Sequence, residues 1–140
     1  MIETATTFGI RIDVESFFVP EKSDASKNQY FFAYSISITN TTEEHVQLLN
    51  RRWVITDGWG RVEEVQGPGV IGLQPWIEPG ATFQYQSFCP LTTPTGSMRG
   101  QYEMVSVPDD TKGNRSGEGP ARSFSADIPQ FFLVEPGSFH

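Results

Sequence analysis

The sequence contains few of the residues that build disulfides and metal centres. It has one cysteine, Cys89, and two histidines, His45 and His140. One thiol cannot form a disulfide within the chain, and one cysteine with two histidines cannot complete a Cys/His metal site. Without disulfides, and without a basic and then apolar amino-terminal segment, the protein is expected in the cytoplasm. Cys89 stands between Phe88 and Pro90, which favours a packed small residue over a reactive thiol.

Long apolar runs and an excess of basic charge are also missing. No apolar run approaches the roughly 20 residues that cross a bilayer, so we expect no membrane partner. The 17 acidic and 10 basic side chains give a net charge of −7. This charge repels a polyphosphate backbone, so nucleic acid is not expected as a partner. A chain of 140 residues is expected to form a single domain, residues 1–140, with its core in residues 8–134.

Familiar catalytic motifs are absent as well. The sequence has no G-x-S-x-G nucleophile elbow, no calcium-binding loop and no histidine placed as a base. The adjacent pairs Asp109-Asp110 and Glu63-Glu64 are interpreted as solvated charge; Glu63 and Glu64 in particular cannot easily share one ion, because neighbours on a strand face opposite ways. We therefore predict that the protein is not an enzyme and has no catalytic residue, metal site or cofactor. Acid–base chemistry by carboxylates distant in the sequence stays open.

The sequence does contain a series of alternating segments. Residues 8–18 and 30–40 alternate with a period of two, which is typical of half-buried strands. Residues 46–57 change phase near Leu49, which indicates a β-bulge or a crossing between sheets. Further strands are expected over residues 61–66, 82–89, 98–107 and 124–133, and Pro129 shifts the phase of the last one.

No segment has a helical period, and turn signals separate about seven to eight short strands. The predicted fold is therefore an all-β, immunoglobulin/fibronectin type III-like antiparallel β-sandwich. Trp53 is expected in its core facing Tyr102, whose hydroxyl is expected to bond to the backbone. Residues 108–122 are rich in Gly, Asp and Ser and are expected to form a flexible loop. The tail, residues 135–140, is expected to be frayed.

A glycine-rich loop has the form G-x-G-x-x-G, with glycines at Gly67, Gly69 and Gly72. This pattern binds phosphate when a strand precedes it and a helix follows it. Here Pro75 and Pro79 prevent a following helix, and Pro68 removes one backbone donor from the loop. The dinucleotide-binding fold is therefore excluded.

A weaker anion site remains, since amides of a glycine-rich turn can bind an anion without a helix. Its candidate residues are the three glycines and the nearby Arg51, Arg52 and Arg61. The alternative is a purely structural loop, with the arginines paired to acidic residues of the hairpin, Asp57, Glu63 and Glu64.

Two tryptophans, Trp59 and Trp76, are candidate interaction residues, because aromatic side chains commonly anchor protein interfaces. The alternative is that each packs on its own hairpin. Open sheet edges are a second route to association, since pairing across an edge would produce a homodimer.

Several segments together carry a family resemblance: Tyr30-Phe31-Phe32-Ala33-Tyr34-Ser35-Ile36, Val46-Gln47-Leu48-Leu49, Arg51-Arg52-Trp53-Val54-Ile55-Thr56-Asp57, residues 65–72, residues 93–104 and Ile128-Pro129-Gln130-Phe131. In combination they resemble the ApaG family over roughly residues 8–134. The resemblance implies a fibronectin type III-like β-sandwich and no settled activity. The loop at 108–122 looks longer than the family's usual turn.

The bacterial family is named for its gene's company with a diadenosine tetraphosphate hydrolase and is associated with cobalt and magnesium sensitivity. Related eukaryotic domains are attached to F-box proteins and to a DNA polymerase delta-interacting protein, where protein binding is the natural role. The resemblance therefore implies an ApaG-like, non-enzymatic interaction module with an unidentified protein partner. The alternatives are binding of pyrophosphate or a dinucleoside polyphosphate at the glycine loop, or a role in cobalt and magnesium homeostasis.

Overall fold

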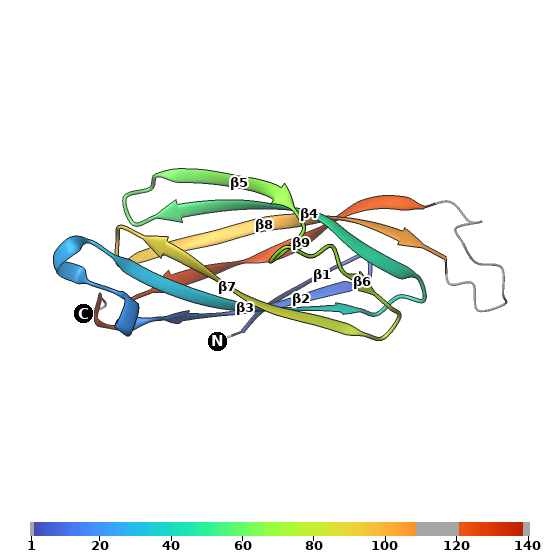
Figure 1. Cartoon of the computed structure of the whole chain (residues 1–140), viewed down its shortest axis with the longest axis horizontal. Helices are drawn as coiled ribbons and strands as arrows, with labels where there is room; N and C mark the ends of the chain where they lie inside the picture. The colour runs from blue at the N-terminus through green and yellow to red at the C-terminus, as the bar shows by residue number, and fades with distance from the viewer. Residues whose placement is uncertain (1, 109–120, 139–140) are drawn as a thin grey trace.

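The computed structural model describes residues 2–108 and 121–138 and consists of β-strands with three short 3₁₀ turns (Figure 1). The strands in these residues are β1 Glu3–Thr7, β2 Ile10–Phe18, β3 Tyr30–Asn40, β4 His45–Asp57, β5 Val62–Pro68, β6 Trp76–Ile77, β7 Thr82–Leu91, β8 Thr95–Val107 and β9 Arg122–Val134. The turns are η1 Pro20–Lys22, η2 Ala25–Lys27 and η3 Pro136–Ser138. None of these elements is a helix that could span a membrane.

The strands form two antiparallel sheets that face each other, which confirms the predicted β-sandwich. One sheet has the order β1-β2-β3-β7, and the other has the order β5-β4-β8-β9. The short strand β6 pairs with β4 beyond the end of β5. Strand β4 therefore lies between β8 on one side and both β5 and β6 on the other, and the glycine loop connects those two partners.

Two strands were not expected from the sequence. Strand β1 pairs with β2 through a turn at Phe8 and Gly9, whose φ angles are 48° and 79°. The predicted strand over residues 8–18 therefore begins at Ile10, because a left-handed backbone at residues 8 and 9 cannot continue a strand. Strand β6 has only two residues, too few for a period to be visible.

Both predicted phase changes are confirmed as register shifts. On β4 the register with β8 shifts between Leu48 and Asn50, which leaves Leu49 as the extra residue. On β9 the pairs Met98–Phe131 and Gly100–Ile128 enclose an extra residue near Pro129. Proline has no N–H to donate, so a bulge is a favourable place for it in a sheet.

The core contains an aromatic cluster and one buried polar pair. Trp53 packs against Tyr34 and Phe131, with ring centroids 5.5 and 5.9 Å away. The Tyr102 hydroxyl forms a short hydrogen bond with the hydroxyl of Tyr85 on the opposite sheet. The expected backbone bond of Tyr102 was therefore wrong, and the tyrosine pair joins the two sheets instead.

Most of the predicted flexible loop, residues 109–120, lies outside the described residues. Arg122, which was assigned to that loop, is the first residue of β9 and bonds to Glu44. The predicted frayed tail is ordered in part, because Pro136–Ser138 forms η3 and the Glu135 amide donates to the Pro94 carbonyl at 2.9 Å. Residues 139–140 lie outside the description.

Candidate functional site

The glycine loop begins with the last two residues of β5, Gly67 and Pro68, and is fixed to β4 by backbone bonds. The Gly69 amide donates to the carbonyl of the bulge residue Leu49 at 2.8 Å. Val70 and Leu73 exchange two backbone hydrogen bonds of 2.8 Å around a turn at Ile71 and Gly72. Val70 is buried in the core, at 1% exposure. The loop is therefore a tight turn held by backbone hydrogen bonds, and no helix begins at its end.

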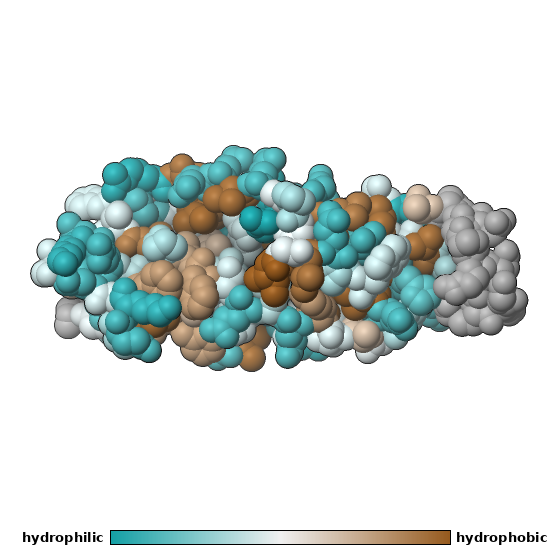
Figure 2. All heavy atoms as spheres, viewed as in Figure 1, coloured by the Kyte–Doolittle hydropathy of each residue, from teal (hydrophilic) through white to brown (hydrophobic). Residues whose placement is uncertain are grey.

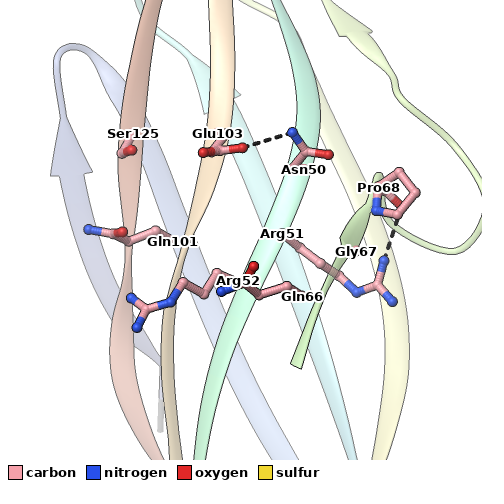
Figure 3. A pocket seen from close by; sticks show the side chains of 9 residues that line it. All are labelled: Asn50, Arg51, Arg52, Gln66, Gly67, Pro68, Gln101, Glu103 and Ser125. Atoms are coloured by element: carbon pink, nitrogen blue, oxygen red, sulfur yellow. Dashed lines mark hydrogen bonds between the residues drawn. The ribbon is translucent and has the colours of Figure 1, made fainter. Parts of the chain in front are cut away.

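Arg51 holds the start of this loop. Its guanidinium donates to the carbonyls of Pro68 and Gly69, both at 3.0 Å. In Figure 3 the Arg51 side chain points toward Pro68, whereas that of Arg52 points toward Gln101. A Cβ at Gly67 would lie 3.2 Å from the Arg51 guanidinium, so Gly67 leaves room for this side chain. Arg51 thus joins the loop to β4 through backbone oxygens.

The other two predicted anion-binding arginines are directed elsewhere. Arg52 pairs with Glu64 at 3.2 Å, and Arg61 pairs with Asp57 at 3.0 Å. Arg61 precedes β5 while Gly67 is near its end, so about six residues, or roughly 20 Å, separate them along the strand. The structure therefore brings Arg51 to the glycines and leaves Arg61 at the opposite end of the hairpin. The alternative of arginines paired with hairpin carboxylates is confirmed for Arg52 and Arg61.

Several backbone N–H groups of the loop are already engaged in hydrogen bonds within the chain. The amides of Gly69, Val70 and Leu73 all donate to backbone carbonyls. An anion nest needs free amides that converge on one point. A pyrophosphate at this loop would compete with carbonyl oxygens for both the amides and Arg51. Pyrophosphate binding by Gly67, Gly69 and Gly72 with Arg51, Arg52 and Arg61 stays an untested prediction, with fewer available donors than the sequence implied.

A shallow polar pocket of about 400 Å³ lies on the outer face beside this loop. Its outer-face lining includes Arg52, Gln101 and Glu103, and the Asn50 amide donates to Glu103 at 2.7 Å (Figure 3). Among the described residues no group of three or more His, Cys, Asp or Glu side chains could hold a metal ion. A role in cobalt or magnesium homeostasis therefore gains no site from this part of the chain.

The two candidate tryptophans lie far apart. Trp59 is 77% exposed on the turn between β4 and β5, and Trp76 is 53% exposed on β6. Trp76 is paired with Gln47, about ten residues along β4 from Asp57, which corresponds to roughly 30 Å. They cannot anchor one small site together, so each marks a different surface.

The turn that carries Trp59 is rigid. The Asp57 carboxylate accepts hydrogen bonds from the amides of Trp59 and Arg61, both at 2.9 Å. Partial burial alone would raise the pKa of Asp57, but these bonds and the Arg61 guanidinium outweigh it and lower the pKa. The ionised carboxylate thus holds the turn at neutral pH.

Trp76 belongs to an exposed apolar cluster that the sequence analysis missed. Ile71 and Leu73 are 57% and 49% exposed on the glycine loop, and Trp76 follows within a few residues. We call these three residues the loop patch. Figure 2 shows hydrophobic atoms in the middle of the face of the molecule that it presents, over the loop that joins β5 to β6. The signal in the sequence was an apolar residue directly before Gly72, where a hairpin turn usually has asparagine or aspartate.

Ile71 has an unusual backbone conformation. Its φ angle is 43°, in the left-handed region, and that of Gly72 is 80°. A β-branched residue in this region is an outlier, because its Cβ crowds the following carbonyl oxygen. The exposed tip of the loop thus carries a β-branched side chain, that of Ile71, which is strongly disfavoured at this backbone conformation.

Cys89 is the only cysteine, and it is buried. Burial, with a smaller contribution from the negative charge of Glu63, raises its pKa to about 11. The thiol is thus protonated at neutral pH, as the packed-residue interpretation expects.

Comparisons with known proteins agree on one family. A family model described as the ApaG domain matches residues 20–106. The chain is 48% identical to the protein ApaG of Bdellovibrio bacteriovorus over 130 residues, which cover 93% of each chain. It is 47% identical to the protein ApaG of Mesorhizobium japonicum over 134 residues, covering 96% of this chain and 94% of the relative. A crystal structure of a putative ApaA protein from Bordetella pertussis is 42% identical, covers 95% of each chain and superposes with a TM-score of 0.79.

Proposed function

The chain belongs to the ApaG domain family, and from that premise we propose that it is a non-enzymatic protein-interaction module that docks through the loop patch. The patch is Ile71, Leu73 and Trp76. The partner is a protein with an apolar depression that receives the tip of the glycine loop. The chain and this partner are expected to meet in the cytoplasm.

The observation that carries the proposal is the conformation and exposure of Ile71. A non-glycine residue held in a sparsely populated backbone region costs about 1–3 kcal/mol. Ile71 is mostly exposed, so burial of its side chain in this chain's core does not offset that cost. Strain of this kind gathers at binding sites, where a contact outside the chain gives the residue its role. Contact with a partner would bury the Ile71 side chain.

Rigidity of the loop supports the same conclusion. The bonds from Arg51, from Gly69 to Leu49 and between Val70 and Leu73 fix the backbone on both sides of the tip. The Gln74 side chain adds a bond of 2.9 Å to the Leu49 carbonyl. A preorganised loop loses little conformational entropy when it binds, so its exposed apolar area contributes more fully to affinity.

The composition of the patch fits a small interface core. Tryptophan is enriched among the residues that dominate interface energetics, and aliphatic neighbours exclude water from such residues. Isolated exposed apolar residues are ordinary, but here three lie within six positions on and beside one loop held by hydrogen bonds. Val62 is also exposed, yet it stands on β5 outside this patch and serves as a matched control.

Affinity capture from a lysate of the source organism tests the proposal with four baits: the natural protein, Ile71→Asn, Trp76→Ala and Val62→Asn. We expect a partner retained by the natural protein and by Val62→Asn to be lost from the other two baits. Affinity for the purified partner should fall at least about tenfold, since central interface residues cost more than roughly 1.4 kcal/mol when removed. Equal recovery on all four baits would contradict the proposal.

A further inference from the structure

The edges of the two sheets are protected unequally. Strands β1 and β2 pack against β9, and the Asp127 amide donates to the Thr7 hydroxyl at 3.2 Å, which covers that side of the sandwich. Strand β5, the edge of the other sheet, carries the charged pair Glu63-Glu64. Strand β7 is the remaining edge, and its ten residues, TFQYQSFCPL, include no charged side chain. Edge strands usually carry charges or prolines that prevent pairing with other chains, and β7 has only Pro90, next to its last residue.

The register shows which backbone groups of β7 face outward. The Asn40 amide donates to Ala81, so Asn40 and every second residue before it on β3 bond toward β7. Their partners on β7 are the odd-numbered residues, such as Tyr85. The even-numbered residues, including Gln84, Gln86 and Phe88, therefore direct their N–H and C=O groups away from β3. Pro90 fits this phase, since a proline in a sheet turns its missing N–H toward the open edge.

The same even-numbered residues present exposed side chains on the outer face of the sheet. Phe88 is 50% exposed and packs against Phe31, with ring centroids 5.4 Å apart. The amino group of Lys22 lies 5.3 Å from the Phe88 ring centroid. A strand added beside β7 would thus find both unpaired backbone groups and apolar surface next to Phe88. Among the described residues the backbone of β7 pairs with β3 alone.

We propose that β7 pairs antiparallel with β7 of a second copy of this chain, which joins two four-stranded sheets into one continuous sheet. In the register that centres the two-fold axis on Gln86, Gln86 lies opposite Gln86 of the second copy, and Gln84 lies opposite Phe88 of the second copy. Pro90 then falls opposite Thr82 at the end of the pairing, so its missing N–H leaves only a terminal position without a donor. This surface is distinct from the loop patch, and the inference goes beyond the proposed function.

The lack of charge on β7 makes it suited to pairing with a second copy of itself. In an isologous pair a residue at the two-fold axis faces the same residue of the other copy, so a charge at that position would meet a like charge. Strand β7 is neutral and avoids this repulsion, although the whole chain carries a net charge of −7. Self-pairing of β5 in a register centred on Glu63 and Glu64 would instead place like charges opposite each other.

Sedimentation velocity over a concentration series up to about 500 µM tests the dimer, since a contact formed by one pair of strands is small and small interfaces are weak. We expect the natural protein to shift from monomer to dimer across the series. Gln86→Lys places two like charges at the axis, and Gln86→Pro removes an N–H that the monomer does not use. Gln86→Lys should raise the dissociation constant several-fold, and Gln86→Pro, which removes one N–H bond from each copy, about tenfold. The matched control is Gln66→Lys on β5, which should leave the dimer intact.

A monomer at every concentration overturns the inference, and so does a dimer that both Gln86 variants leave unchanged. Far-ultraviolet circular dichroism checks that each variant is folded. If Gln86→Pro does not fold, the pair Gln86→Lys and Gln66→Lys decides alone. Partner capture by the loop patch is a separate readout, so failure of the dimer leaves that result unaffected.

Discussion

Replacing Gly69 by alanine is expected to destabilise the protein by about 2–4 kcal/mol, from backbone strain and lost loop hydrogen bonds. The φ angle of Gly69 is +64°, which an alanine adopts only with strain. Its added Cβ would lie 2.1 Å from the carbonyl oxygen of Leu73, the atom that accepts the bond from Val70. Backbone rather than a flexible side chain would have to move, so the loop would lose its pinned shape. Urea unfolding measures the change in free energy.

The matched control for this substitution is Gly72→Ala. Gly72 also has a positive φ, of 80°, but an added Cβ there has no atom within 4 Å. It should therefore cost only the conformational strain, about 1 kcal/mol. Equal costs for the two variants would show that the close approach of Gly69 to Leu73 is not a constraint on the loop.

Stability should fall steeply above about pH 10, the pKa of an unperturbed tyrosine. Burial raises the pKa of Tyr34, Tyr85 and Tyr102 in the folded protein. The folded state thus holds these protons more tightly than the unfolded state does. Their contribution is complete below the unfolded pKa and is lost as the pH rises toward the folded values. Between the unfolded and the folded pKa, each buried tyrosine lowers the free energy of unfolding by about 1.4 kcal/mol per pH unit. Three such tyrosines together lower it by on the order of 4 kcal/mol per unit.

Urea unfolding at several pH values between about 8 and 12 checks this slope, and the double variant Tyr85→Phe with Tyr102→Phe is its control. Removing both hydroxyls together leaves neither one buried without a partner, so stability near pH 7 should change little. The alkaline slope should fall to about a third or less, because only Tyr34 remains. An unchanged slope in the double variant would exclude the tyrosine pair as its source.

The fold followed from the sequence where a period of two was long enough to be visible. Strand β3 was bounded correctly because its apolar face continues without interruption from Tyr30 to Ile38. The bulges at Leu49 and Pro129 were also visible, since each moves the apolar residues to the other parity. Strand β1 was missed because Phe8 extended the alternation backward, whereas the turn at Phe8 and Gly9 depends on backbone angles that the pattern does not encode.

The candidate site was less predictable, because nearness in sequence is a poor guide to position along a strand. Arg51, Arg52 and Arg61 lie within eleven positions, yet Arg51 and Arg52 project from opposite faces of β4 and Arg61 stands beyond the far end of β5. The glycine motif drew the interpretation toward phosphate, but the residues between the glycines, Ile71 above all, form the exposed tip. The spacing of the glycines indicates only that the backbone can turn there. The structure shows that the side chain exposed at the turn is that of Ile71.

Unfolding of Ile71→Asn by urea tests the central claim most directly, because it needs no knowledge of the partner. The claim is that Ile71 serves a contact outside the chain and strains the loop in its free state. Asparagine tolerates the left-handed conformation and is favoured in such turns. The variant should therefore be as stable as the natural protein or more stable, by up to about 1 kcal/mol. A loss of about 1 kcal/mol or more would show that Ile71 supports the fold, and would contradict the claim.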